Sequence, residues 1–550
     1  MKNLFLLFLL VISSLTFSAC NNRKTASLIL HHGHIYTVDS AFSLQQAMAI
    51  KDGKILATGT NEEILKEYDA DSTINLEGKT VFPGFIDAHC HFTGFATDMW
   101  KCNLTGTKSF AEVIDKIKAF ASQQKYDWIY GRGWDQNDWE DKSFPNRSVL
   151  DSLFPNTPVF LKRIDGHAAL VNNKALQLAG VTDTSHINGG EFEKKGNKLT
   201  GILIDNAMDF VEAKIPAIDD ALANQYFLAA QQICFADGLT SVQDCGINEH
   251  TLHLIDELQQ SGKLKMKIFA LLSDSMPYID EWIKKVPYET NRLRMGGFKV
   301  YADGALGSRG ACLLQDYRDK KSWHGFMLTD SSTLETIASK LANTKFQLCT
   351  HAIGDSANRE MLKIYSRHLQ KGNNKRWRIE HAQVVEPSDL RYFTEYNIIP
   401  SVQPTHATSD MYWAERRLGP ERIHHAYANR DLLATNKWMP LGTDFPVEDI
   451  SPIKTFFAAV VRKDTAFYPP NGFQTENRLD RKSAIRGMTI WAAKAGFEEN
   501  KKGSLEKGKD ADFVILNNNL VTCSENAILK TKVLSTFSNG EEVYSSGEHR

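Results

Sequence analysis

A long alternation of short apolar segments with amphipathic helical segments constrains the fold of this chain more than any other feature. The apolar segments typical of strands are 81–86, 239–243, 266–272, 298–302, 347–350, 378–381, 398–403 and 439–443. Helical patterns lie between most of them, at 225–236, 251–261, 333–342, 358–369, 388–396 and 421–433. Strands that alternate with helices form parallel sheets, and eight such units close into a barrel. We therefore expect an α/β chain in which residues 81–500 form a (β/α)₈ TIM-like barrel.

The segment between the first two expected strands is far longer than an ordinary βα loop. Residues 93–224 are therefore expected to form a lobe inserted after strand one. Residues 26–80 and 501–550 each contain a few short strands, which cannot bury much apolar surface alone. We expect these two terminal parts to pair into one small β-sandwich domain, with the barrel set between them.

Residues 1–20 differ in composition from the rest of the chain. Lys2 precedes an apolar run at 4–17 that is too short to span a bilayer, which needs about 20 apolar residues. Small residues then lead to Cys20, a pattern typical of a secretory signal peptide. The junction resembles a bacterial lipobox, although Phe17 stands where Leu is commoner. We expect export and a lipid anchor on Cys20, at the periplasmic or cell-surface face of a bacterial membrane; a plain signal peptide with a chance Cys stays open.

The charge balance and the cysteines argue against two classes of protein. The formal net charge of −2 leaves no electrostatic case for a nucleic-acid partner, which requires a basic face. The eight cysteines form no C-x-x-C pair, and a disulfide framework is not expected in a chain of 550 residues. Anionic small molecules stay open as substrates, because a local site can be basic inside a nearly neutral protein.

Side chains that bind metals lie at the ends of the expected strands. In barrels of this kind the catalytic groups lie at the C-terminal ends of the strands. The residues found there are His89, His91, Lys299, His351, His381 and Asp444. Imidazole and carboxylate together suit Zn²⁺ and similar divalent ions. One such His is usually an ordinary surface or core residue, but four around a single mouth predict a metal site.

Eight motifs in this order make the chain similar to a known group of enzymes. They are PGFIDAHCH (83–91), DGH (165–167), DGALGSR (303–309), HAIGD (351–355), IEHAQ (379–383), SVQPTH (401–406), GTDFPV (442–447) and KDADF (509–513). The set resembles the amidohydrolase superfamily, and within it amidohydrolase family 3, the YtcJ-like metal-dependent hydrolases. The similarity covers almost the whole chain after the signal segment.

This resemblance implies a hydrolase that acts on carbon–nitrogen bonds of small, non-peptide amides. It implies that one or two divalent ions, expected to be Zn²⁺, are bound by His89, His91, His351, His381 and Asp444. The metal would lower the pKa of a bound water and polarise the substrate carbonyl. Asp444 would take the proton of the water and pass it to the leaving nitrogen. Lys299 matches the position of a carboxylated, metal-bridging lysine in binuclear relatives; an ordinary buried Lys stays open.

Further residues are candidates for contacts with the substrate. Asp165 and His167 lie in the inserted segment and are expected to close over the site, with a purely structural role left open. Gln403 and His406 follow strand seven and are expected to face the mouth. Arg309 follows strand four and is expected to bind an anionic group or a loop carboxylate. A homodimer is compatible with the sequence.

Two alternative functions are weighed against amide hydrolysis. Hydrolytic deaminases of the same superfamily carry a Glu three residues after the strand-five His, where this chain has Gly354, followed by Asp355. That difference argues against deamination. A non-catalytic, metal-binding surface lipoprotein would not need the complete set of ligands.

Replacing Cys20 with Ser should abolish lipid labelling of the protein. Stable anchoring requires more than one acyl chain, so wild-type protein should take up a labelled fatty acid and sediment with membranes. The Cys20→Ser protein should do neither. Metabolic labelling followed by membrane fractionation measures both properties, and unlabelled, freely soluble wild-type protein would contradict the lipoprotein hypothesis.

Overall fold

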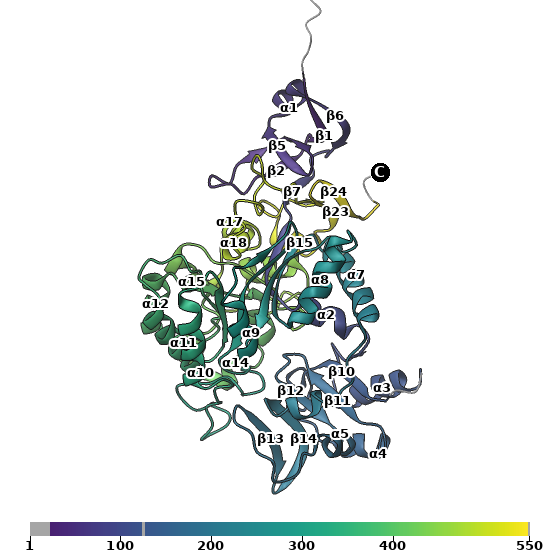
Figure 1. The fold of residues 1–550 in the computed structure, drawn as a ribbon, viewed down its shortest axis with the longest axis vertical. Coiled ribbons are helices and arrows are strands. Elements are labelled where there is room, and N and C mark those ends of the chain that lie inside the picture. The colour runs from purple at the N-terminus through teal and green to yellow at the C-terminus, as the bar shows by residue number, and fades with distance from the viewer. Residues whose placement is uncertain (1–22, 124–126, 548–550) are drawn as a thin grey trace, which may run out of the picture.

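The computed structural model describes residues 23–123 and 127–547. The expected signal segment 1–20 lies outside the described residues. Within the two described ranges, no helix combines the length and the apolar character needed to cross a bilayer. The described chain is elongated, with two terminal sheets at one end, an α/β barrel in the middle and a lobe at the other end (Figure 1).

The barrel is built from parallel strands whose neighbours follow the order of the chain. The strands are β8 (Phe85–Cys90), β15 (Leu239–Ile247), β16 (Lys267–Ser273), β18 (Leu293–Tyr301), β19 (Gln347–Ala352), β20 (Arg378–His381) and β21 (Ile399–Ser401). A two-residue strand, β17 (Tyr288–Glu289), pairs antiparallel with β18. Buried side chains of the barrel strands form the largest hydrophobic cluster together with those of the surrounding helices. The expected α/β, TIM-like barrel is therefore confirmed.

The expected eighth strand at 439–443 is wrong as a regular strand. Within this segment only Leu441 pairs with a neighbour, through one isolated parallel bridge to Val402. Pro440 has no N–H to donate to a ladder, and the N–H of Leu441 bonds to the carbonyl of Gly487 instead. The segment still joins both edges of the sheet, because Gly442 N donates to Val402 O at 3.1 Å and Ala88 N to Leu441 O at 3.2 Å. The barrel is thus nearly closed by an irregular segment.

Helices with one apolar face cover the outside of the barrel. They are α7 (Asp220–Ala236), α8 (Glu249–Gln260), α10 (Ser331–Ala342), α11 (Asp355–His368), α12 (Leu390–Tyr396), α15 (Asn429–Asn436), α16 (Pro452–Val461), α17 (Arg481–Gly487) and α18 (Ile490–Ala495). Side-chain caps begin several of them; Asp330, for example, accepts from the N–H of Thr333 in α10. The expected helix at 421–433 is instead divided into a 3₁₀ turn, η3 (Arg422–His425), and α15.

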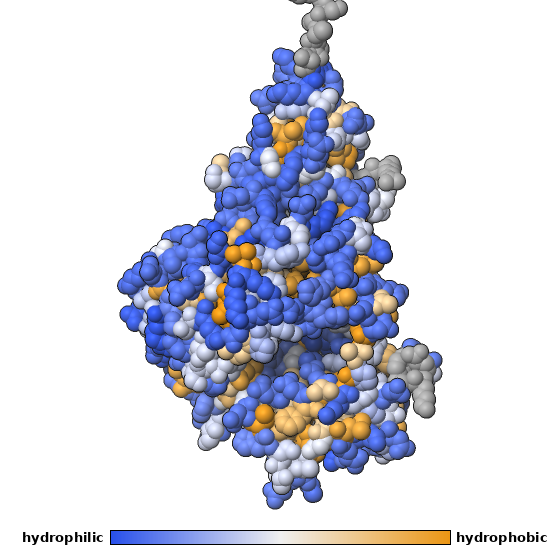
Figure 2. Space-filling model, in the orientation of Figure 1, coloured by the Kyte–Doolittle hydropathy of each residue, from blue (hydrophilic) through white to orange (hydrophobic). Residues whose placement is uncertain are grey.

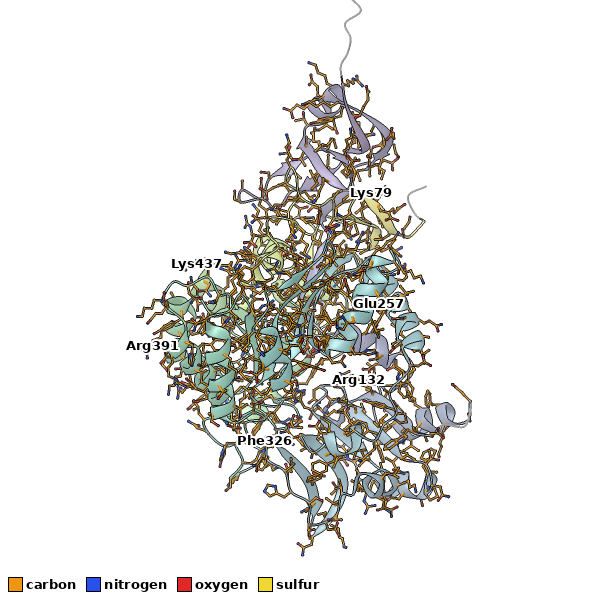
Figure 3. The ribbon with its side chains drawn as sticks, in the orientation of Figure 1. Lys79, Arg132, Glu257, Phe326, Arg391 and Lys437 are labelled. Atoms are coloured by element: carbon orange, nitrogen blue, oxygen red, sulfur yellow. The ribbon has the colours of Figure 1, made fainter. Side chains whose placement is uncertain are left out.

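Most of residues 93–224 form a lobe with a sheet of its own. Its strand order is β13 (Gly190–Lys195), β14 (Lys198–Asp205), β12 (Ala168–Val171), β11 (Val159–Arg163), β10 (Ile129–Trp134) and β9 (Cys102–Asn103). Two separate hydrophobic clusters contain alternate residues of these strands. Phe326, from the loop that follows β18, packs against the first cluster where the lobe meets the barrel (Figure 3).

Strands from both ends of the described chain share one sheet. Its order is β24 (Glu541–Ser545), β23 (Val533–Ser538), β22 (Phe513–Leu516), β7 (Thr80–Pro83), β2 (His34–Tyr36) and β3 (Leu44–Gln45). A second sheet has the order β5 (Lys54–Gly59), β4 (Ala47–Lys51), β1 (Lys24–His31) and β6 (Tyr68–Asn75). One hydrophobic cluster contains side chains from both sheets.

A buried ion cluster connects the barrel to the C-terminal strand. Lys267 of β16 lies 2.7 Å from Asp510 and 2.6 Å from Asp512, which immediately precedes β22. Because breaking one partner out of a buried pair leaves an uncompensated charge, this cluster holds the two parts in one arrangement. Lys267 is the first residue of β16, so the terminal sheets lie at the N-terminal ends of the barrel strands. The lobe lies at the opposite end (Figure 1).

Candidate metal centre

A cavity of about 570 Å³ lies between the lobe and the C-terminal ends of the barrel strands. The surface is hollowed between the barrel and the lobe (Figure 2). The volume of the cavity falls in the range of small-molecule sites, about 300–1,000 Å³. The lining residues come from both parts: His91, His351 and Asp444 from the barrel, and Asp165 and His167 from the lobe.

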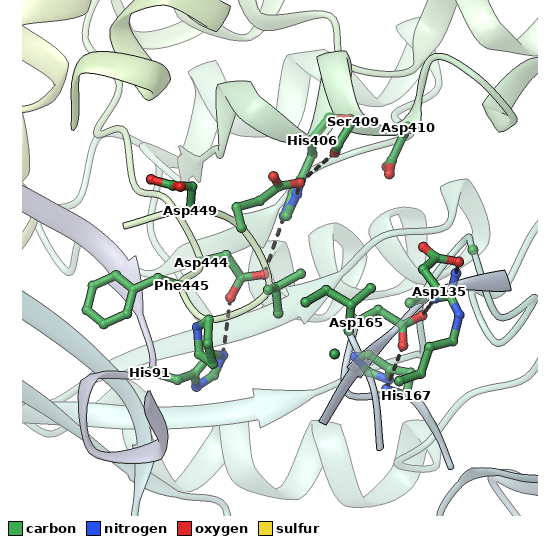
Figure 4. A pocket seen from close by; sticks show the side chains of 18 of the residues that line it. His91, Asp135, Asp165, His167, His406, Ser409, Asp410, Asp444, Phe445 and Asp449 are labelled. Carbon is green, nitrogen blue, oxygen red and sulfur yellow. Dashed lines mark hydrogen bonds and ion pairs between the residues drawn. The ribbon is translucent and has the colours of Figure 1, made fainter. Parts of the chain in front are cut away.

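Asp444 joins two groups of imidazoles at the bottom of this cavity. Its Oδ1 lies 3.5 Å from Nε2 of His89 and 3.2 Å from Nε2 of His91. Its Oδ2 lies 3.3 Å from Nε2 of His406, and His381 belongs to the same group (Figure 4). In each group the potential ligand atoms lie within 4.8 Å of one another. Asp444 is therefore shared by two groups of residues that could each hold a metal ion.

His351 and Lys299 complete the set predicted from the strand ends. The rings of His351 and His381 are 4.5 Å apart. Lys299 is fully buried, with Nζ 3.2 Å from Nε2 of His89. Among the residues that the structure describes, no carboxylate lies within ion-pair distance of Lys299. All six expected ligands are thus gathered at one place.

The electrostatics of the site suit a bound cation. Burial, together with Lys299, lowers the pKa of His89 to about 4. Burial also lowers the pKa values of His351 and His381 well below the ordinary value. Neutral imidazoles have the lone pair that a metal requires. Burial raises the pKa of Asp444, but its contacts with His406 and His91 outweigh burial and hold it well below the ordinary value.

One oxygen of Asp444 gives a direct test of this fit. Oδ1 is buried and makes no hydrogen bond of good geometry, although it lies 3.2 Å from Nε2 of His91. A buried carboxylate oxygen left in this state is costly unless a cation balances it. The backbone of Asp444 is also held in the left-handed region, with φ 66°, and that of His381 with φ 70°. Such conformations cost energy for non-glycine residues and concentrate at functional sites. The residues present therefore fit one or two divalent ions.

Glu380 positions His89, a role that the sequence analysis did not assign. Its Oε2 lies 2.6 Å from Nδ1 of His89, which leaves Nε2 directed at Asp444. Burial raises the pKa of Glu380, but His89 and Arg378 outweigh burial and lower it to about 2. Strand alternation could have indicated this residue, because Arg378 and Glu380 share the interior side of β20. Strand alternation would direct His381 away from the interior side of β20. It reaches the mouth because its backbone leaves the extended conformation, with φ 70°.

Gln403 and Arg309 do not lie where the sequence analysis expected them. Gln403 is buried beneath the cavity, and its Oε1 accepts from Nδ1 of His381 at 2.8 Å, so it orients a ligand and does not line the cavity. Arg309 also does not line the cavity; its guanidinium pairs with Asp319 at 2.9 Å. The loop-carboxylate alternative for Arg309 therefore agrees with the structure. His406, which carried no metal role in the sequence analysis, does line the cavity.

Asp165 and His167 lie where the lobe closes over the metal centre. The His167 ring is 5.1 Å from that of His351, and its Nδ1 lies 2.5 Å from Oδ1 of Asp205. Burial opposes a charge on His167, but Asp205 outweighs burial and raises its pKa. Asp165 pairs with the buried Arg163 and accepts from the N–H of His167 at 3.0 Å. Both residues can therefore contact a substrate placed over the centre.

Comparison with known proteins agrees with this geometry. Residues 72–544 match the model of the amidohydrolase family, Amidohydro_3. YtcJ of Bacillus subtilis is 30% identical over 526 residues, covering 94% of this chain and 99% of YtcJ. The N-substituted formamide deformylase of Arthrobacter pascens is 26% identical over 538 residues, covering 93% of this chain and 97% of that protein. The crystal structure of a metal-dependent hydrolase from Pyrococcus horikoshii aligns with a TM-score of 0.74 at 28% identity, covering 90% of this chain and 99% of that one.

Replacing Glu380 with Gln should weaken metal binding. Loss of a carboxylate that orients a ligating imidazole typically lowers metal affinity about 10–100-fold. Competition with a chromogenic chelator measures the affinity. Glu335→Gln is the matched control, because Glu335 makes the same 2.6 Å contact with His368 away from the cavity. Equal metal affinity in the two variants would show that Glu380 has no positioning role.

Proposed function

The chain belongs to the amidohydrolase family and is a hydrolase that acts on carbon–nitrogen bonds, and from this premise we propose that its substrates are small, non-peptide amides. The observation that carries the proposal is the shared position of Asp444 between two groups of imidazoles at the bottom of the cavity. The name of the Arthrobacter pascens relative, a deformylase of N-substituted formamides, supports an amide-type substrate.

The residues of the chain divide the work of the proposed reaction. A divalent metal, which we propose to be Zn²⁺, supplies acidification of water and polarisation of the amide carbonyl. His89, His91, His351, His381 and Asp444 would hold it. Asp444 is ionised at neutral pH, because its pKa lies well below the ordinary value, so it can accept the proton of the attacking water. The same carboxyl can then return the proton to the leaving nitrogen. His406 orients Asp444 through the contact of 3.3 Å at Oδ2.

Deamination is the weaker candidate because the structure has no room at position 354 for the Glu side chain that deaminases carry there. A side chain at Gly354 would meet the carbonyl oxygen of Cys312 at 2.0 Å from Cβ. The next residue, Asp355, accepts from the N–H of Leu314 at 2.8 Å and does not line the cavity. Nothing at this position can therefore protonate a ring nitrogen of a substrate.

We also propose that Lys299 is carboxylated and bridges two ions. Burial lowers the pKa of Lys299, but Tyr301 and the acidic groups around it outweigh burial, so the free amine carries a proton. Nζ of Lys299 lies 3.2 Å from Nε2 of His89, so an ammonium group there would repel a divalent ion held by His89. Reaction of the deprotonated amine with CO₂, with loss of a proton to solvent, gives an anionic carbamate. The carbamate would remove the repulsion and offer two oxygens to the ions.

Two proposals concern the rest of the chain. We propose that lipid on Cys20 anchors the protein to a bacterial membrane, which rests on residues 18–20 of the sequence. We also propose that the two terminal sheets form one β-sandwich, and their common hydrophobic cluster supports it.

Replacing Asp444 with Asn should lower kcat for amide hydrolysis by at least about 10²–10⁴-fold, the typical contribution of a general acid–base. Turnover of a panel of N-acyl amines by the Zn²⁺-loaded protein measures the change, with metal content determined in parallel. Chelation should remove the wild-type activity. Asp431→Asn, an exposed position on α15, is the control and should keep the wild-type kcat. Wild-type turnover by the Asp444→Asn protein would remove Asp444 from the mechanism.

Replacing Lys299 with Ala should remove much of the metal and of the activity. Elemental analysis of wild-type protein should find close to two ions per chain, because a carbamate bridges two. A small carboxylic acid added to the variant should partly restore both metal content and turnover, since it supplies the missing bridging oxygens. A single tightly held ion together with full activity of the variant would show that the lysine is structural.

A further inference from the structure

The cavity above the metal centre is strongly acidic. Among the described residues that line it, seven are carboxylates and two are Lys or Arg. The carboxylates are Asp135, Asp138, Asp165, Asp410, Asp444, Glu448 and Asp449. The basic residues, Lys299 and Arg163, lie at the metal centre and in the wall of the lobe. His167 and His406, whose pKa values are raised, are each paired with a carboxylate. The balance therefore favours a cationic substrate over an anionic one.

Most of these carboxylates already have a charged partner. Arg163 is fully buried and is shared by Asp135 and Asp165, so it has little charge left for a ligand. The remaining pairs are Asp449 with Lys454 at 2.5 Å, Asp138 with Lys108 at 3.5 Å and Glu448 with His406 at 3.0 Å. Asp444 faces the imidazoles. Asp410 is the exception.

Asp410 has only neutral hydrogen-bond partners. Its Oδ2 accepts from the hydroxyl of Tyr427 at 2.8 Å and from Nε2 of Gln383 at 3.3 Å. Across the described part of the chain, no Lys, Arg or His lies within ion-pair distance of it. Its carboxylate points toward the open centre of the cavity (Figure 4). Burial raises its pKa to about 7, although the nearby His406 opposes this shift.

The helix that carries Asp410 also sets its distance from the reacting centre. Asp410 ends α13 (Pro404–Asp410), one helical turn after His406, which contacts Asp444. A separation of four residues places two side chains on the same helix face, about 6 Å apart along the axis. A group bound by Asp410 would therefore lie about one helical turn from the contact between His406 and Asp444.

The wall on the other side of Asp444 is apolar. Phe445 and Asp410 lie on opposite sides of Asp444 in Figure 4. Phe95 and Phe445 form an edge-to-face pair with ring centroids 5.4 Å apart. Pro446, Val447 and Ile450 extend this wall. Glu448 and Asp449 lie in the same run of residues, so the cavity offers an apolar patch beside its carboxylates.

We propose that this site takes cationic amides: an ammonium or quaternary ammonium group of the substrate binds Asp410, and the apolar part of the substrate packs against Phe95 and Phe445. The inference rests on the proposed amide hydrolysis and specifies its substrate class. An ammonium group would supply the charge that Asp410 lacks. Arg163, His167 and His406 are each paired with carboxylates, and Lys299 lies at the metal centre.

A pair of isosteric amides tests the proposal. N-(2-trimethylammonioethyl)butanamide and N-(3,3-dimethylbutyl)butanamide differ only in a charged nitrogen or a neutral carbon at the branch point. The metal-loaded wild-type protein should prefer the charged amide in kcat/KM by about tenfold or more, the effect of one charge-assisted contact. The matching pair of ketones, which cannot be hydrolysed, should show the same preference in Kd by calorimetry. A second pair with the cation on the acyl part covers the reverse orientation of the amide.

Two variants assign the preference to Asp410. Asp410→Asn keeps the shape of the side chain and should lower the preference to about twofold or less, since only a neutral contact remains. Glu415→Gln, on the neighbouring helix α14 (Ala414–Leu418), removes an exposed charge outside the cavity and should keep the wild-type preference. A preference that survives Asp410→Asn, or none in the wild-type protein with either pair, overturns the proposal.

The same measurements separate this proposal from the proposed function. Equal hydrolysis of charged and neutral amides would overturn the cationic substrate and leave amide hydrolysis intact. Charge-selective binding of the ketones without hydrolysis of any amide would support the acidic subsite and contradict the proposed reaction.

Discussion

The burial of one carboxylate, Asp444, is the constraint on which the rest of the site depends. An ionised carboxyl group inside a protein costs several kcal/mol unless charged or hydrogen-bonding groups surround it. Here the imidazoles of His89, His91 and His406 surround both oxygens. Asp444 reaches these imidazoles because its segment is irregular and its own backbone is in the left-handed region. A metal ion would complete the balance at Oδ1, which makes no hydrogen bond of good geometry.

A layer of polar groups below the centre keeps its imidazoles in place. Glu380 binds His89 from beneath, and the buried Arg378 contacts Gln243 at 2.6 Å and the carbonyl of Ala88 at 3.2 Å. Gln403 holds His381 in a similar way, because its Oε1 accepts from Nδ1 of His381. Side chains from different strands fill the interior of such barrels in layers. His89 and His381 are therefore fixed by the barrel interior.

The lobe contributes the outer half of the cavity and so decides what reaches the centre. Arg417 of α14 binds Oδ1 of Asn137 in the lobe at 3.0 Å and the carbonyl of Gly307 in the barrel at 3.1 Å. This contact holds Asp135 and Asp165 over the same space as Asp410. The chemistry of the reaction thus lies in the barrel, whereas the charge of the outer cavity comes from both parts.

The sequence by itself determined the architecture of the barrel and the ligands at its mouth, because strand and helix periodicities are local and because side chains at strand ends meet at one edge of a parallel sheet. The strand ends alone bring His89, His91, His351, His381, Lys299 and Asp444 to one mouth. Only the tertiary structure decided the roles of Glu380, Gln403, Arg309 and Asp410. Two of these depend on a partner elsewhere in the barrel: His89 lies 291 residues from Glu380, and Gln403 lies 22 residues from His381. Residue spacing carries no signal of such contacts, since they arise when separate strands, helices and loops pack against one another.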